Sequence, residues 1–240
     1  MMRYKMLSAL CLMVLTSFAA IAKNHSMRTN GWRVGEEVDA ETVSDVSINR
    51  WFTKQPIPDD VFARMIGKSY PEDCSVPRSS LCYLRLLHYD FDGKTRKGEM
   101  VCNKAIAADL ISIFKELYRQ RYPIQGVQLV DDFDADDELS MRANNSTCFF
   151  YRRIKGSKKL SAHSRGMAVD INALYNPYYR RKSDGRVIVQ PSNAKKYCNR
   201  DADFPYKIER NDLLHRLFLQ HGFRWGGAWR SMKDYQHFEK

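Results

Sequence analysis

Residues 161–172 read Ser161-Ala-His163-Ser-Arg-Gly166-Met-Ala-Val-Asp170-Ile-Asn172. The run from Met167 to Ile171 is short and apolar, which predicts a buried strand. Gly166 stands just before this run and suits a tight turn or a close approach of two backbone segments. The pattern therefore places His163 on a loop or at a strand end, and Asp170 inside the strand.

The carboxylate of Asp170 needs a strong partner in an apolar strand, because burying an unpaired charge costs a large free energy. A metal ion is one such partner, since His and Asp are ordinary zinc ligands. A second polar cluster, Asp234-Tyr-Gln-His237-Phe-Glu239, offers further ligands. The alternative is a salt bridge from an arginine to Asp170, with His163 as an ordinary structural histidine.

Residues 1–22 are typical of a signal peptide. Arg3 and Lys5 precede the apolar run Leu7 to Ala19, which is too short to span a bilayer comfortably. The sequence Ala20-Ile21-Ala22 is a suitable cleavage site. We therefore expect an exported protein, periplasmic or extracellular after cleavage near Ala22, with no stable membrane insertion of the mature chain. Retention of the segment as an uncleaved anchor is the alternative.

The chain is basic. It has 39 Lys and Arg against 28 Asp and Glu, a formal net charge of +11 that falls to +9 once Arg3 and Lys5 are removed. A basic exported protein favours an anionic partner, such as a cell-wall polymer, a membrane surface or a nucleic acid. Because the basic residues are scattered and the aromatic residues look structural, we expect no nucleic acid. We also expect a monomer.

Five cysteines remain after the signal segment. Cys74 and Cys82 lie close together in a loop rich in proline, which suits a local disulfide, and Cys148 and Cys198 are candidates for a second bridge. Cys102 lies in an apolar run and is expected as a small core residue. The sequence alone does not fix the pairing.

The rest of the chain indicates an α+β fold. Residues 23–50 are polar and suggest a mobile leader or a linker that faces the cell wall. Apolar spacing predicts a helix within residues 51–70, a hairpin from Leu81 to Asn103, and a long helix that Asn103 caps. The acidic run from Asp131 to Glu138 is expected as a solvated turn, with calcium binding or charge balance as alternatives.

Together these residues resemble a known family. The pattern Ser161-x-His163-x-x-Gly166-x-Ala168-x-Asp170-Ile171, followed by Trp225-Gly-Gly and Asp234-x-x-His237-Phe-Glu239, is similar to the M15 zinc peptidases. These include D-alanyl-D-alanine carboxypeptidases, VanY-like enzymes and L-alanyl-D-glutamate endopeptidases. Ala228 departs from the pattern, because relatives often carry an acid after the two glycines.

The resemblance implies the domain plan. Residues 23–58 would be an N-terminal extension, and residues 59–240 would be one zinc-peptidase domain. Its fold would be α+β, with a small, mostly antiparallel sheet flanked by helices on one side, like the hedgehog signalling domain and the D,D-peptidases. The substrate would be a stem peptide of peptidoglycan.

The resemblance also implies roles at the site. His163, Asp170 and His237 match the three ligands of Zn²⁺, and Asp234 matches the general base. In this family an Asp at the position of the general base, here Asp234, is more typical of the endopeptidase branch. Three protein ligands leave one zinc position for a water molecule, whose pKa the metal lowers. Glu239 is either a rival base or a partner that orients His237.

A substrate carboxylate favours an arginine clamp. Arg142, Arg152 and Arg165 are candidates, and Arg142 is preferred because it lies in the polar loop before the site strands. Ser161 is expected to bind substrate, to fix His163 or only to shape a turn. Two other interpretations remain: a zinc-containing module of the same fold that binds cell wall or a protein without catalysis, and a basic exported structural protein without metal.

Overall fold

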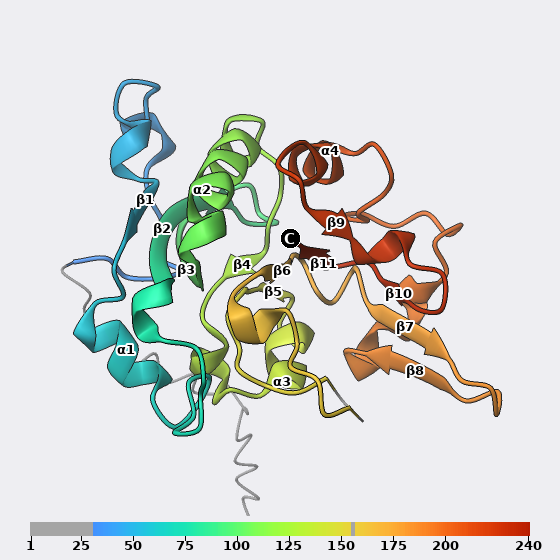
Figure 1. The fold of residues 1–240 in the computed structure, drawn as a ribbon. Coiled ribbons are helices and arrows are strands. Elements are labelled where there is room, and N and C mark those ends of the chain that lie inside the picture. The colour runs from blue at the N-terminus through green and yellow to red at the C-terminus, as the bar shows by residue number, and fades with distance from the viewer. Residues whose placement is uncertain (1–30, 155–156) are drawn as a thin grey trace, which may run out of the picture.

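The computed structural model describes residues 31–154 and 157–240. The expected signal segment, residues 1–22, lies outside these ranges. The described chain is a mixed α/β structure with several small sheets and few long helices (Figure 1). Within it, no helix has both the length and the apolar character needed to cross a membrane.

The longest strands form the predicted hairpin. Strand β2 (Leu81–Tyr89) and strand β3 (Thr95–Asn103) pair in antiparallel register, and β1 (Thr53–Gln55) adds to the free edge of β2. Strand β3 begins three residues before the expected start at Gly98, because the tight turn at Gly93 allows pairing to continue to Thr95.

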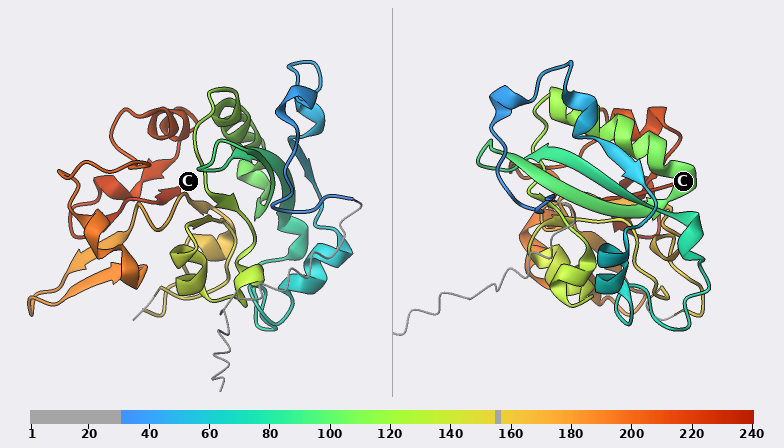
Figure 2. Two further views of the ribbon diagram at one scale, coloured as in Figure 1. Left: turned by 180° about the vertical axis from the view of Figure 1, so that it is seen from behind. Right: turned by 90° about the vertical axis from the view of Figure 1, so that its left-hand side faces the viewer.

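Helix α2 (Lys104–Arg119) follows this hairpin and packs on β2. The side chain of Asn103 accepts a hydrogen bond from the backbone N–H of Ala105 at 3.0 Å, so the predicted cap is confirmed. The apolar stripe of α2 is buried as its spacing predicts. Helix α4 (Leu213–Gln220) lies beside α2, and Asp212 caps it by accepting from the backbone N–H of His215 at 2.7 Å (Figure 2).

The N-terminal segment is packed against the sheet, so the expected mobile leader is wrong for residues 31–50. Trp32, Val38 and Ile48 are buried in the same core as α2. The backbone N–H of Val38 donates to Thr95 O at 2.9 Å, which ties the segment to β3. A few well-spaced apolar side chains anchor a stretch whose average composition is polar. Two short 3₁₀ turns occupy the stretch, Ala40–Thr42 and Ile48–Arg50.

The acidic run is more than a solvated turn. It spans a 3₁₀ turn (Val130–Phe133) and the start of helix α3 (Asp137–Arg142). Asp131 is buried and accepts hydrogen bonds from the backbone N–H and hydroxyl of Ser69, at 3.0 and 2.8 Å. This contact ties the run to the chain that follows helix α1 (Asp59–Met65). The exposed-turn prediction is therefore wrong for Asp131.

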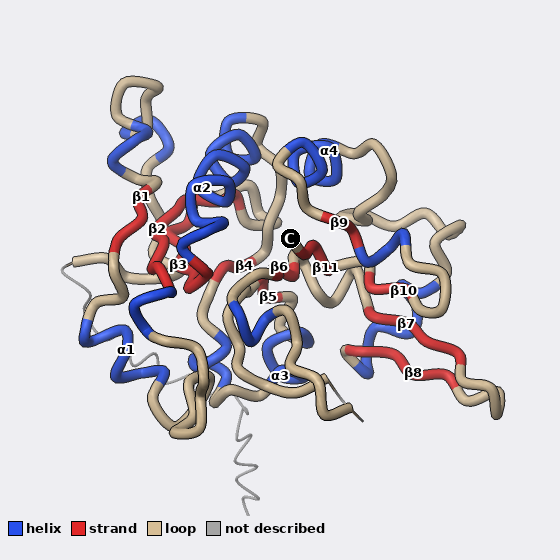
Figure 3. The backbone as a smooth tube through the Cα atoms, in the orientation of Figure 1, coloured by secondary structure: helices blue, strands red, loops and turns tan. Residues whose placement is uncertain are grey.

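Short strands build the other sheets. Strands β6 (Ala168–Asp170), β11 (His237–Glu239) and β9 (Arg224–Trp225) form one sheet in the order β6-β11-β9. A second has the order β10-β7-β8 and contains Lys233–Asp234, Tyr178–Arg181 and Val187–Gln190. Strands β4 (Gly126–Val127) and β5 (Asn145–Ser146) form a parallel pair. The expected single small sheet is thus several, joined by the long loops in Figure 3.

The five described cysteines are free thiols, and neither expected disulfide is formed. The Cys82 thiol donates to Gln55 O at 3.2 Å, and the buried Cys148 thiol donates to Gly166 O at 3.4 Å. Each of these two thiols is held against backbone of another segment, and Cys102 is a small core residue as expected.

Candidate metal centre

Three residues that are far apart in the sequence meet at the centre of the molecule. His163 begins a 3₁₀ turn (His163–Arg165), Asp170 ends β6, and His237 begins β11. The antiparallel pairing of β6 with β11 places His237 directly opposite Asp170. All three side chains are buried, and each offers one ligand atom to a common point.

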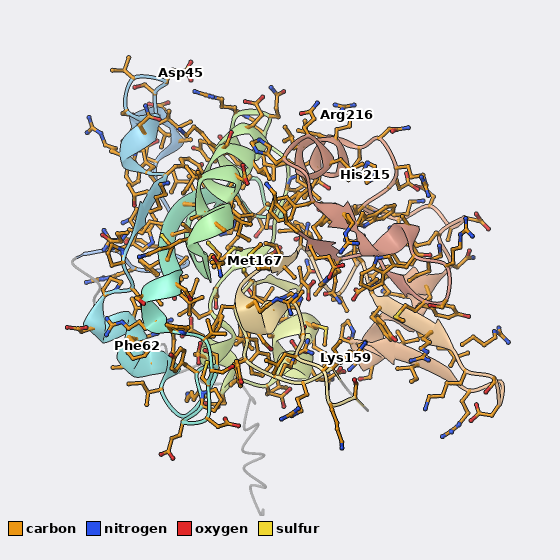
Figure 4. The ribbon with its side chains drawn as sticks, viewed as in Figure 1. Asp45, Phe62, Lys159, Met167, His215 and Arg216 are labelled. Carbon is orange, nitrogen blue, oxygen red and sulfur yellow. The ribbon has the colours of Figure 1, made fainter. Side chains whose placement is uncertain are left out.

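A glycine makes the close approach of His163 to this point possible. Gly166 has a φ of +64° and ends the 3₁₀ turn in the left-handed conformation, which favours glycine. A Cβ at this position would come within 2.6 Å of Asn103 N, so there is no room for a side chain. The sequence prediction of a turn and a close backbone approach is confirmed. Met167, which follows it, is labelled at the centre of Figure 4.

The three ligand atoms form a nearly equilateral triangle. His163 Nε2 lies 3.2 Å from His237 Nδ1, His237 Nδ1 lies 3.0 Å from Asp170 Oδ1, and His163 Nε2 lies 3.3 Å from Asp170 Oδ1. Ligand atoms about 2.0 to 2.1 Å from a tetrahedral zinc ion lie about 3.3 Å from one another. The donor set and its spacing therefore fit a zinc ion.

Other groups hold the two imidazole rings. His163 Nδ1 lies 2.7 Å from Cys148 O, which accepts its hydrogen and leaves Nε2 free to act as a ligand. Glu239 Oε2 lies 3.5 Å from His237 Nε2, the ring nitrogen outside the triangle. This position favours Glu239 as the partner that orients His237, as carboxylates do around metal-binding histidines.

The cluster is strongly polarised. Burial alone would raise the pKa of Asp170, but the nearby His163 and His237 hold that pKa well below its usual range. Burial alone would lower the pKa of His237, yet its contacts with Asp170 and Glu239 raise it to about 10. Asp170 is thus a carboxylate that favours a cation beside it.

Asp234 lies next to this cluster with an incomplete set of contacts. It ends β10, and its Oδ1 is buried without a hydrogen-bond partner. Burial, with a smaller contribution from the charge of Asp170, raises the pKa of Asp234 to about 7. A buried carboxylate oxygen without a donor can accept a proton from a reactant placed next to it.

Two further buried polar side-chain atoms have no hydrogen-bond partner. One is Gln236 Oε1, in the residue just before His237, and the other is Asn144 Nδ2, in the chain after α3. The other end of the Gln236 amide donates to Met141 Sδ at 3.6 Å, which links this residue to helix α3. Buried polar atoms without partners cost free energy in a folded core.

The sequence analysis missed one carboxylate near the centre. Asp137, in the acidic run, forms an ion pair with Arg152 whose N–O distance is 2.7 Å. Burial raises the pKa of Asp137, and the charge of Arg152 opposes this effect; Asp170 and His163 are close enough to contribute as well. The sequence contains no clear signal for this role of Asp137, because nothing except its place at the start of α3 distinguishes it from the other acids of the run.

The predicted substrate-binding residues have different environments. Arg142 is the last residue of α3. Its side chain is exposed and forms no ion pair with any described residue. Arg152 is already paired with Asp137. Ser161 Oγ accepts from the backbone N–H of His163 at 3.3 Å, a contact over two positions that fits both the fixing of His163 and a local turn.

Comparison with known proteins identifies one family. Residues 155–240 match the M15 peptidase family model described as D-alanyl-D-alanine carboxypeptidase. The matched segment contains His163, Asp170, Asp234 and His237. Searches of curated proteins and of solved structures returned no match.

Proposed function

We propose that this protein is a zinc-dependent peptidase that hydrolyses a peptide bond in the stem peptides of peptidoglycan, because residues 155–240 match the M15 peptidase family model. The cleaved bond is either the L-alanyl-D-glutamate bond or the terminal D-alanyl-D-alanine bond. The proposal includes export of the chain, with removal of residues 1–22, because its substrate lies outside the cytoplasm.

One observation carries the proposal. The triangle of His163 Nε2, Asp170 Oδ1 and His237 Nδ1 lies beside Asp234, whose Oδ1 is buried without a hydrogen-bond partner. Three ligands from the protein are typical of a catalytic zinc site, whereas structural sites have four. A carboxylate next to such a site is the usual general base.

His163, Asp170 and His237 would hold the metal. Zinc, when bound, supplies a Lewis acid and a water molecule of lowered pKa. Asp234 accepts a proton at its free Oδ1 and returns it to the leaving amine. Gln236, just before His237, offers its unpartnered Oε1 to the backbone of the substrate, and Arg142 offers an unpaired guanidinium to one of its carboxylates.

The direct test is digestion of purified muropeptides by the metal-free protein, with and without added zinc, followed by mass spectrometry. We expect no cleavage after chelation and full cleavage after zinc is restored. Loss of a terminal alanine identifies a carboxypeptidase, and release of the stem after its first alanine identifies an endopeptidase. Cleavage that persists without metal would overturn the proposal.

A zinc-containing module that binds without catalysis is the alternative. Such a module has no use for a buried carboxylate without a hydrogen-bond partner, and burying one costs free energy. The free Oδ1 of Asp234 therefore favours the peptidase.

A further inference from the structure

A two-stranded arm extends from the strand that carries Asp234. Strands β7 and β8 form a hairpin that projects from the body of the molecule in both Figure 1 and the left view of Figure 2. Strand β10 pairs with the base of β7, where Asp234 lies directly opposite Tyr178. The base of the arm is therefore directly beside the candidate general base.

The arm and the turn after it are strongly cationic. Residues 178–196 contain six cationic side chains and one carboxylate, a net charge of +5 in a chain whose total is +11. The cations are Arg180, Arg181, Lys182, Arg186, Lys195 and Lys196. Arg186 is partly neutralised at the tip, because it pairs with Asp184 at an N–O distance of 2.6 Å. Nearly half of the net charge thus lies in this one stretch of sequence, and the hairpin itself, residues 178–190, carries +3.

Three of these cations form no direct ion pair in the described part of the chain, although the charge of Lys182 also acts on Asp184. Arg180, Arg181 and Lys182 form no ion pair with any residue in the described ranges, and both arginines are exposed. Like charges on adjacent residues repel one another, so the arrangement costs free energy until an anion binds. Their side chains are available to an external partner.

The register of the strands gives the direction of the arm relative to the site. Residues paired across antiparallel strands share a face, so Asp234 and Tyr178 lie on the same face as Arg180. Two residues along a strand correspond to about 7 Å. Arg180 therefore follows the candidate base along one face, while Arg181 lies on the opposite face.

We propose that the β7–β8 arm is a docking element that binds the carboxylates of polymeric peptidoglycan and presents its stem peptides to the metal centre. Cations on both faces suit a polymer with repeated anions better than one small anion. Stable insertion into a lipid surface would require a set of exposed apolar side chains. Val187 is the one large apolar side chain of the arm that is strongly exposed, at 45%.

The identity of the polymer rests on the proposed function, whereas binding of an anionic polymer by the arm does not. The test therefore measures binding separately from hydrolysis. The full protein is mixed with chelator and with insoluble peptidoglycan sacculi stripped of attached polymers, and the bound fraction is measured by sedimentation from about 50 to about 500 mM salt.

The variant Arg180→Gln/Arg181→Gln/Lys182→Gln removes three charges from the arm, two of them on exposed side chains. We expect its affinity for sacculi to fall about tenfold at low salt, since each exposed ionic contact contributes a fraction of a kcal/mol. The matched control, Arg33→Gln/Arg50→Gln/Lys54→Gln, removes three charges from the N-terminal segment and should bind like the wild type. With zinc present, the ratio of turnover on sacculi to turnover on a short soluble stem peptide should fall in the arm variant and stay unchanged in the control.

Several outcomes would overturn the proposal. Equal binding by the arm variant and the control would remove the arm from recognition. Undiminished wild-type binding to sacculi whose carboxylates have been amidated would exclude the carboxylates as the ligand. Binding only to sacculi that retain phosphodiester polymers, or to vesicles of anionic phospholipid but not to sacculi, would assign the arm to another partner. If neither substrate is cleaved, the peptidase proposal fails while the binding result stands.

Discussion

Gly226 lies against Asp234 so closely that no side chain fits between them. A Cβ at Gly226 would come within 2.6 Å of Asp234 O, 2.9 Å of Asp234 Cβ and 3.2 Å of His237 Cβ. The bare backbone at Gly226 therefore sets the distance between the candidate base and one of the candidate ligands.

The Gly226→Ala variant should lose activity through displacement of Asp234. A shift of about 1 Å at a catalytic group reduces turnover by about 100-fold. We expect a loss of this size in kcat/KM on muropeptides, with a folded protein by circular dichroism. Gly126→Ala is the matched control, because its nearest neighbour would be Asn145 Oδ1 at 3.7 Å, an ordinary contact. Equal activity of the two variants would contradict this account of Gly226.

The Asp234→Asn variant separates metal binding from proton transfer. The amide keeps the size of the carboxylate but cannot accept the proton, so we expect turnover to fall by about 100-fold or more. Zinc content, measured by atomic emission, should stay equal to that of the wild type because Asp234 is not one of the three candidate ligands. Asp203→Asn, at an exposed position, is the control. Full activity of Asp234→Asn would exclude Asp234 as the base.

The ion pair between Asp137 and Arg152 should stabilise the fold. Its side chains are only 27% and 33% exposed, so water screens the attraction incompletely. A double-mutant cycle with Asp137→Asn and Arg152→Gln, measured by urea denaturation, should give a coupling free energy of about 1 kcal/mol. The pair of Asp184 and Arg186 is more exposed, at 46% and 73%, and should give a coupling near zero. Equal coupling free energies for the two pairs would show that burial does not strengthen the ion pair of Asp137 and Arg152.

Acid should destabilise the protein through His88. This histidine is buried, with Nδ1 2.7 Å from Ile124 O, and burial lowers its pKa to about 4. Because the unfolded chain binds the proton near pH 6.5, stability is lost as the pH falls from about 6.5 toward 4, by about 2 to 3 kcal/mol in all.

Urea denaturation of the wild type and of His88→Gln at pH 7.5 and pH 4.5 measures this effect. The variant should be less stable at neutral pH, since the buried contact is lost, but should lose less stability on acidification. His88→Leu removes the same proton site with different packing and should show the same reduced pH dependence. A pH dependence equal to that of the wild type in both variants would exclude His88 as the cause.

Local signals predicted much of the fold. The cap at Asn103, the hairpin after Leu81 and the strand that contains Asp170 all depend on neighbouring residues, which the sequence displays directly. The grouping of His163, Asp170 and His237 was also predictable, because turn and strand patterns accompany the chemistry of these residues. The structure brings together the side chains that the family resemblance selected.

Long-range packing accounts for the errors. Trp32 and Ile48 are buried because the sheet and α2 offer them a surface, which a polar local composition does not reveal. Asp137 meets Arg152 only because α3 folds against the chain before His163. The expected disulfides depended on proximity along the sequence, whereas the Cys82 and Cys148 thiols face backbone from other segments.

The pairing of β6 with β11 has a consequence for biosynthesis. Asp170 and His237 are separated by 67 positions, yet they are direct neighbours in one sheet. A growing chain that has just released Asp170 from the ribosome cannot build the centre, because the strand with His237 has not been translated. The metal centre can therefore form only after the strand that contains His237 has been translated.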